Sequence, residues 1–378
     1  MRRGRSGRRG AALPAAGAGA PVCRRAAGRE RRGRGDQEAP CRALAGVRPR
    51  GGRPLAGPTQ ERFDRLEREH DNLRAAMRWA VERGNAGLGL RLVGALWPFW
   101  RVRGYHQEGR RWATAFLDFP AAPEDAGLRL DALLADGHLA YLQGDNVTAR
   151  AQAEAGLALT REAGDREREA KFLVQLGHVD VEERDFAAAE RVYRAAVEIE
   201  RTLPGQQGLG TALGSLGHGL VRAGEGERAR PYVEEALAVS RATGDLGNAT
   251  SSLLLLGQLA FERGDAEAAR ALLAECLAGA LALDYRRMAM LALIGCAALA
   301  VEGTPERALR LAGFVAAAAA RGELALLPAW RAWLERTSAA AREALGQAAA
   351  VAASTGGAQL SLAEAIAEAR APDGPLGG

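Results

Sequence analysis

Lysine is almost absent from this chain, because 50 of its 51 basic residues are arginines and the single lysine is Lys171. That lysine lies in the helical sequence KFLVQLGHVD, and no GxxxxGK[ST] motif occurs anywhere. A phosphate-binding loop needs a glycine-rich turn at a helix start and a lysine that reaches the phosphates. The sequence therefore excludes a nucleotide-binding loop of this kind, and we expect no cofactor.

Cysteines and aromatic residues are also scarce. Aromatic residues make up 5% of the chain, and the longest apolar run, Met288–Val301, is too short to cross a bilayer. The cysteines show neither CxxC nor another ligand spacing, which argues against a zinc site or a disulfide framework. A cytoplasmic protein without a membrane span or a metal is expected. The four cysteines are Cys23, Cys41, Cys276 and Cys296.

Charge is distributed unevenly. Residues 1–60 hold fifteen arginines and three acids, so the rest of the chain is net acidic although the total is +5. Residues 1–54 consist mainly of Arg, Gly, Ala and Pro without an apolar period, and such a segment cannot bury enough surface to fold. We predict a disordered leader here. An alternative is association with nucleic acid through the arginines by release of counterions.

Turn signals recur every twenty residues from residue 84 onward, with a slip of one residue at the end. Glycine followed by Asp or Asn ends one helix in the left-handed conformation and caps the next. Each segment is therefore predicted to be a helix of about sixteen residues, and two segments make a hairpin. The signals lie at Gly84, Gly104, Glu124, Gly144, Gly164, Arg184, Pro204, Gly224, Gly244, Gly264, Asp284 and Gly303.

The side chains repeat every forty residues. Counted from Gly137, Gly177, Gly217 and Gly257, the residue four before is always leucine and the residue twelve after is always alanine. Small residues let two helices approach closely, and leucine fills the space between them. A hairpin with this pattern buries its apolar face only against the next hairpin. The pattern predicts an all-α fold, a right-handed α-solenoid of helix hairpins with a period of about forty residues.

The same residues resemble the tetratricopeptide repeat (TPR). Its pattern has Leu-Gly in the first helix, Ala in the second and an aromatic residue four positions later; Leu176, Gly177, Ala189 and Tyr193 match it. Three repeats carry another residue at the aromatic position, and the period is forty instead of thirty-four. We expect TPR-like hairpins with longer helices. The replacing residues are Ala153, Val233 and Leu273.

A second resemblance covers about residues 55–371. RLEREHDNLRAAMRW near the start, then RALRLAGFVAAAAARGELALLPAW and LSLAEAIAEA near the end, resemble the helical-repeat region of large bacterial LuxR-type regulators and related STAND-class ATPases. The resemblance implies effector sensing and assembly, with an ATPase module and a helix-turn-helix in a full-length relative. Neither module is recognisable here, so we interpret the chain as an isolated repeat region, with a truncated or fragmented gene as one origin.

These patterns predict five segments. After the leader at 1–54, residues 55–122 are expected to hold N-terminal helical repeats with a tryptophan-rich core, and 123–322 the TPR-like array. Residues 323–371 are expected to form a C-terminal helical cap, followed by a tail at 372–378.

Three of the five histidines share one repeat position, which raises the question of a metal site. Stacked helices lie about 8–10 Å apart, which would spread the histidines along the array. We instead interpret the face that carries them as a groove for a protein or peptide partner, with a merely solvated face as the alternative. Its residues are Asp131, His138, Tyr141, Lys171, His178, Val181, Thr211, His218, Val221, Ser251, Gln258 and Phe261.

Tryptophans gather near the start of the repeats. Trp97 and Trp100 in LVGALWPFW are interpreted as core, and Pro98 is expected to kink this helix or to shift its boundary. The alternative is a small-molecule sensor site formed by Trp97, Trp100 and Tyr105. Two further tryptophans, Trp330 and Trp333, are expected to seal the far end of the array.

No nucleophile with a neighbouring base is recognisable, and no catalytic residue is predicted. Paired carboxylates such as Glu182 and Glu183 lie among arginines on amphipathic helices and are expected to form solvated ion pairs. The sequence thus predicts a non-catalytic interaction module that holds a protein or peptide partner, with self-association as one possibility.

Overall fold

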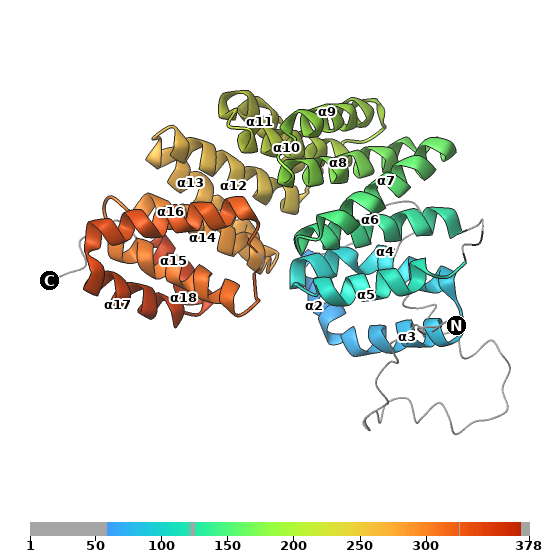
Figure 1. Cartoon of the computed structure of the whole chain (residues 1–378), viewed down its shortest axis with the longest axis horizontal. Helices are drawn as coiled ribbons and strands as arrows, with labels where there is room; N and C mark the ends of the chain where they lie inside the picture. Colours follow the sequence, from blue (N-terminus) through green and yellow to red (C-terminus); the bar gives the residue numbers. More distant parts are fainter. Residues whose placement is uncertain (1–58, 121, 123–124, 325, 372–378) are drawn as a thin grey trace, which may run out of the picture. The chain divides into compact units, whose positions relative to one another are not determined.

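A computed structural model describes residues 59–120, 122, 125–324 and 326–371, and all of them belong to one compact unit (Figure 1). The described residues form helices and no strand, as predicted. The leader predicted at 1–54 and the tail at 372–378 lie outside them. The helices are α2 (Thr59–Arg68), α3 (His70–Glu82), α4 (Ala86–Arg103), α5 (His106–Leu117), α6 (Ala126–Leu142), α7 (Asn146–Ala163), α8 (Arg166–Glu182), α9 (Phe186–Thr202), α10 (Gln207–Arg222), α11 (Gly226–Thr243), α12 (Leu246–Glu262), α13 (Ala266–Ala282), α14 (Arg286–Ala300), α15 (Pro305–Ala320), α16 (Pro328–Leu345), α17 (Gln347–Ala358) and α18 (Leu362–Arg370).

The helices end where the turn signals predict. Gly84, Gly144 and Gly244 have φ of 63°, 79° and 71°, in the left-handed region that glycine adopts without strain. Aspartates follow at the N-caps: the carboxylate of Asp145 accepts from the Thr148 N–H at 3.1 Å, and the equivalent aspartates of α8, α9, α12 and α13 do the same. The twenty-residue spacing therefore reports real helix boundaries.

Each hairpin is closed by the contact that the repeat pattern predicts. The alanines twelve residues after the glycines are fully buried in the second helices, and the leucines four residues before are at most 6% exposed. A Cβ on Gly177 of α8 would lie 2.5 Å from the Tyr193 ring of α9, and one on Gly257 would lie 2.9 Å from Leu273. Only glycine allows these helices to pack so closely.

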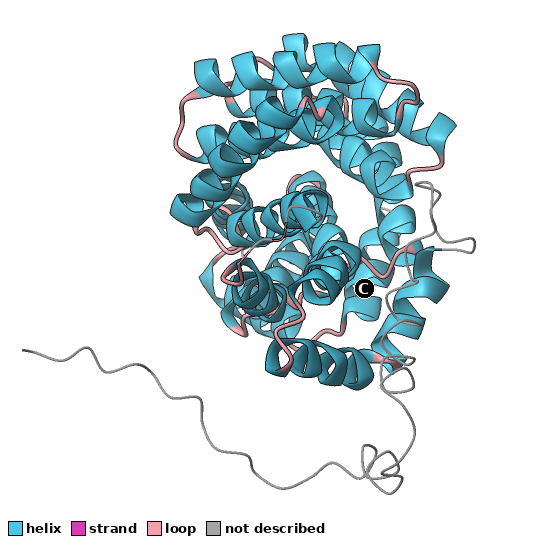
Figure 2. Cartoon of the chain, turned by 90° about the vertical axis from the view of Figure 1, so that its right-hand side faces the viewer, coloured by secondary structure: helices cyan, strands magenta, loops and turns pink. Residues whose placement is uncertain are grey.

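Two rows of helices make up the array (Figure 2). The first helices of successive hairpins, α6, α8, α10 and α12, contact one another directly, and α4 and α14 extend this row at its two ends. Helices α4 and α14 also contact each other. There, Arg103 forms an ion pair with Asp284, and the guanidinium of Arg101 lies 5.5 Å from the centre of the Tyr285 ring.

Two of the four N-terminal tryptophans (Trp79, Trp97, Trp100 and Trp112) are buried in the core, and Trp79 is half-buried. Trp100 is 1% exposed and Trp112 is 9% exposed, whereas Trp97 is half-buried. Helix α4 runs through Pro98 without ending there. The predicted shift of the helix boundary is therefore wrong, since packing on both sides of the proline outweighs the loss of one backbone donor.

The last helices pack by backbone contact. A Cβ on Gly313 of α15 would lie 2.4 Å from the Ser354 carbonyl oxygen of α17, and one on Gly357 would lie 2.0 Å from the Arg310 carbonyl oxygen. Ser361 and Glu364 form a capping box at the start of α18. Among the described helices, none combines the length and apolar character that a bilayer-spanning helix requires.

Candidate functional site

The predicted groove residues lie on the first helices, three each on α6, α8, α10 and α12. We call these twelve residues the histidine face. The residue that follows each repeat glycine is half-buried at all four levels, as at His178 and Gln258. The structure divides the face into an N-terminal section on α6 and α8 and a C-terminal section on α10 and α12, which differ in packing.

Aromatic rings fill the N-terminal section. The Trp97 and His138 ring centres are 5.3 Å apart, those of His138 and His178 are 6.4 Å apart, and Tyr141 stacks on His178 at 5.2 Å. The histidines of neighbouring hairpins thus approach more closely than the helix spacing predicts, because the side chains lean along the row. In the described part of the chain, no three His, Cys, Asp or Glu side chains gather as metal ligands would.

Burial makes these histidines poor bases. It lowers the pKa of His178 to about 4 and that of His218 to about 3, and it holds the pKa of His138 well below its usual range. For His138 and His218 the positive charges of nearby arginines act in the same direction. The imidazoles are therefore uncharged at neutral pH, and this part of the face offers neutral rings.

The residues of the face that lie six positions before the repeat glycines bond to a neighbouring first helix or within their own helix. Asp131 accepts from Arg168 of α8 at 2.9 Å, and Thr211 accepts from Asn248 of α12 at 2.7 Å. Lys171 pairs with Glu167 at 2.5 Å, and the Ser251 hydroxyl donates to the Gly247 carbonyl at 3.1 Å. These four polar groups already have partners, so they contribute to the row itself more than to an open binding surface.

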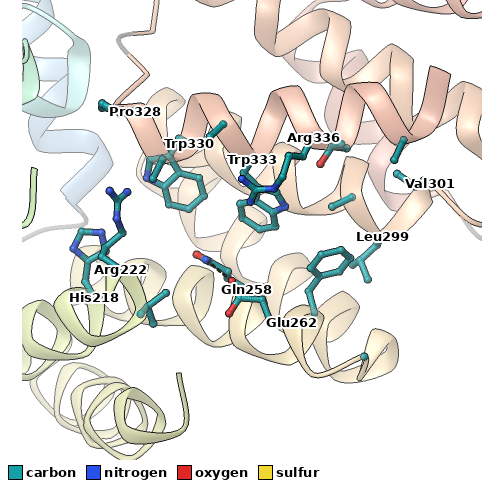
Figure 3. Close-up of a pocket in the computed structure, with 18 of the residues that line it drawn as sticks. His218, Arg222, Gln258, Glu262, Leu299, Val301, Pro328, Trp330, Trp333 and Arg336 are labelled. Atoms are coloured by element: carbon teal, nitrogen blue, oxygen red, sulfur yellow. Dashed lines mark hydrogen bonds between the residues drawn. The ribbon is translucent and has the colours of Figure 1, made fainter. Parts of the chain in front are cut away.

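The C-terminal section lines a cavity of about 880 Å³ (Figure 3). His218, Val221, Gln258 and Phe261 of the face form one wall. Helix α16 forms the opposite wall with two tryptophans and Arg336, and the end of α14 closes a third side. A volume of this size is in the range of small-molecule sites.

Trp330 and Trp333 do not simply seal the end of the array, as the sequence suggested. Their ring centres lie 5.6 Å apart, and the Trp333 ring lies 6.1 Å from that of Phe261 across the cavity. The two indoles are mostly buried, at 9% and 8% exposure, and their remaining surface faces this space. The prediction missed this role because α16 returns to the face from a distant part of the sequence.

Two charged residues on the first helices of the hairpins were also not predicted to belong to the site. Arg222, one turn beyond His218 on α10, lines the cavity. Glu182, expected in a solvated ion pair, is half-buried, and its Oε1 atom has no hydrogen-bond partner among the described residues. Burial raises the pKa of Glu182, while Arg222 and Arg287 oppose that rise. Glu183, in contrast, pairs with Arg150 at 2.8 Å, as predicted. Arg222 and Glu182 each lie four residues after a histidine of the face, and this spacing was the sequence signal that could have identified them.

The residues of the alternative sensor site, Trp97, Trp100 and Tyr105, are largely engaged in packing and hydrogen bonding. Trp100 is buried in the core, and the Tyr105 hydroxyl donates to Glu67 at 2.5 Å. Neither residue, nor Trp97, lines the 880 Å³ cavity, which lies at the other end of the face.

Comparison with known proteins agrees with this architecture. A family model described as tetratricopeptide repeat matches residues 208–282, which span α10 to α13. Candidate HTH-type transcriptional regulators of Mycobacterium bovis and Mycobacterium tuberculosis are 28% identical over 199 residues. The match covers 51% of this chain and 22% of each relative, so the chain spans about a fifth of their length. The chain is thus a TPR-like helical-repeat region similar to a segment of these proteins.

A solved structure shows the same fold over most of the chain. A Rap protein complexed with Competence and Sporulation Factor covers 82% of this chain and 87% of its own, with a TM-score of 0.58 and 12% identity. At this identity the likeness concerns the fold alone.

Proposed function

We propose that this chain is a non-catalytic interaction module of a transcriptional regulator, and that its histidine face holds a protein or peptide partner. The observation that carries the proposal is the continuous row α6, α8, α10 and α12, which presents half-buried neutral side chains and ends in a cavity.

The relatives support a regulatory setting, and a cytoplasmic location is part of this proposal. They are candidate HTH-type regulators that contain a segment similar to this chain, and the Rap protein of similar fold was crystallised as a complex. In such a setting the partner is another module of the regulator, an ATPase module included, or a second copy of the chain. Occupation of the face would change how successive hairpins lean on each other, because each repeat contacts chiefly its neighbours.

Peptides selected from a random library against the full chain test this proposal. We expect Gln258→Arg and Val221→Glu, which introduce charge on the C-terminal section of the face, to weaken a selected peptide about tenfold. Arg191→Glu is the matched control, because Arg191 is exposed on the second-helix row at α9. Selected peptides that bind all three variants as tightly as the wild type would refute the assignment of the face.

Nucleic-acid association through residues 1–54 is the second candidate, favoured by their fifteen arginines against three acids in 1–60. Deleting residues 1–54 and measuring retention on heparin at rising salt tests it. Unchanged retention would remove this candidate and leave the histidine face unaffected.

A further inference from the structure

Arg222 of the cavity wall has no ion-pair or hydrogen-bond partner in the described part of the chain, although its charge opposes, from a distance, the rise that burial causes in the pKa of Glu182. The Arg222 side chain is half-buried on α10. Arginines of the second-helix row behave differently: Arg201 pairs with Glu235 at 3.0 Å and Arg241 with Glu275 at 2.5 Å, each in the next hairpin. Figure 3 shows the side chain of Arg222 rising from α10 toward the side where Trp330 lies.

The charged residues of the lining carry a net charge of +1. They are Arg184, Arg222 and Arg336, against Glu262 and Glu302. The Glu262 carboxylate already accepts from the Gln258 amide at 2.8 Å, which meets part of its hydrogen-bonding need. A guanidinium presents several N–H donors in one plane, and it binds carboxylate, sulfonate and phosphate oxygens through two of them.

The other wall favours a flat apolar body. Trp330 and Trp333 of α16 and Phe261 of α12 form a chain of aromatic rings whose neighbouring centres lie 5.6 and 6.1 Å apart, and all three line the cavity. Aromatic walls of this kind pack against planar ligands with substantial burial of apolar area. Val221 and Ala332 also belong to the apolar lining.

We propose that this cavity is a binding site for a small molecule that carries an anionic group on a flat apolar body. The anionic group pairs with Arg222, and the apolar body packs against Trp330, Trp333 and Phe261. The lining comes from α10, α12, α14 and α16, so the ligand joins the C-terminal cap to the array. This goes beyond the partner-binding proposal, because it adds an effector site at the end of the histidine face.

A matched pair of fluorescent probes tests the site on the full chain. 8-Anilinonaphthalene-1-sulfonate has an anionic sulfonate, and N-phenyl-1-naphthylamine has the same ring system without it. We expect saturable binding of the sulfonate with one site per chain, about tenfold tighter than the neutral probe. Arg222→Gln should abolish that preference, whereas Arg191→Gln on α9 should retain it. Ala332→Trp, which fills the cavity, should remove binding of both probes.

Three results would overturn the assignment. The first is equal affinity of the two probes for the wild type, or no saturable binding of either. The second is an Arg222→Gln protein that retains the preference for the sulfonate. The third is displacement of the sulfonate by the acidic peptide acetyl-Glu-Trp-Glu-amide at micromolar concentration, which would make the occupant a segment of a partner protein.

Discussion

The two sections of the histidine face occupy the same repeat positions but are built differently. On α6 and α8 the rings of His138, His178 and Tyr141 pack on one another and on Trp97, so the side chains fill the space along the row. On α10 and α12 the equivalent residues border a cavity that α16 closes from the other side. The face is packed on α6 and α8, and space remains where α16 lies opposite α10 and α12.

Because of this difference, we expect one section of the face to determine stability and the other to determine binding. Changes in the N-terminal section should alter mainly the free energy of unfolding, and changes in the C-terminal section should alter mainly ligand affinity. The predictions below probe that separation, beginning with the largest expected effect.

Equivalent glycines should tolerate a methyl group unequally. Gly177→Ala places Cβ 2.5 Å from the buried Tyr193 ring, and we expect it to lower the free energy of unfolding by about 2–3 kcal/mol. Gly257→Ala meets Leu273 at 2.9 Å, and its expected cost is about 1 kcal/mol, because an aliphatic side chain adjusts more easily and alanine favours the helix. Urea unfolding of both variants measures the difference. Equal losses would show that the two hairpins pack alike.

Acid should weaken the fold through the histidines. The pKa of His178 is lowered to about 4 in the folded chain, so the unfolded chain binds the proton first as pH falls below about 6.5. The contribution of the neutral His178 to the free energy of unfolding is complete above about pH 6.5 and declines toward pH 4. We expect His178 alone to remove about 2 kcal/mol between pH 7 and pH 5.

The variant His178→Gln isolates this effect, because Gln258 occupies the same position in a later hairpin. Several buried acids, Asp136 and Asp180 among them, have raised pKa values and act in the opposite direction, so the difference between wild type and variant is the quantity to compare. Parallel stability curves of the two proteins from pH 7 to pH 5 would contradict the prediction.

The smallest expected effect is an increase in the free energy of unfolding. The Tyr193 hydroxyl is buried and has no hydrogen-bond partner among the described residues, and burial raises the pKa of Tyr193 well above its ordinary value. Tyr193→Phe should raise the free energy of unfolding by about 1 kcal/mol, because it removes an unsatisfied polar group. Tyr232→Phe serves as control, since its hydroxyl is exposed and accepts from Arg194 at 3.3 Å. A loss of stability in Tyr193→Phe would contradict the prediction, because it would mean that the hydroxyl forms a stabilising hydrogen bond.

Local chemistry explains why the array was predictable. Gly144, Asp145 and the buried Ala149 act within a few residues of each other, so their spacing fixes helix ends and hairpin contacts in any context. The cavity depends on the meeting of α16 with α10 and α12, which no repeat period encodes. For that reason Trp333 was expected to seal the far end of the array, and Arg222 was not predicted as a site residue.

The contact between α4 and α14 changes how such an array should come apart. Repeat proteins with neighbour contacts alone fray from their ends, because removing a terminal hairpin leaves the others intact. Here the ion pair of Arg103 with Asp284 ties an early helix to a late one, so opening at the beginning of the row also loosens its far end. The described helices should therefore unfold as a single cooperative unit, and local unfolding at α4 should also destabilise α14.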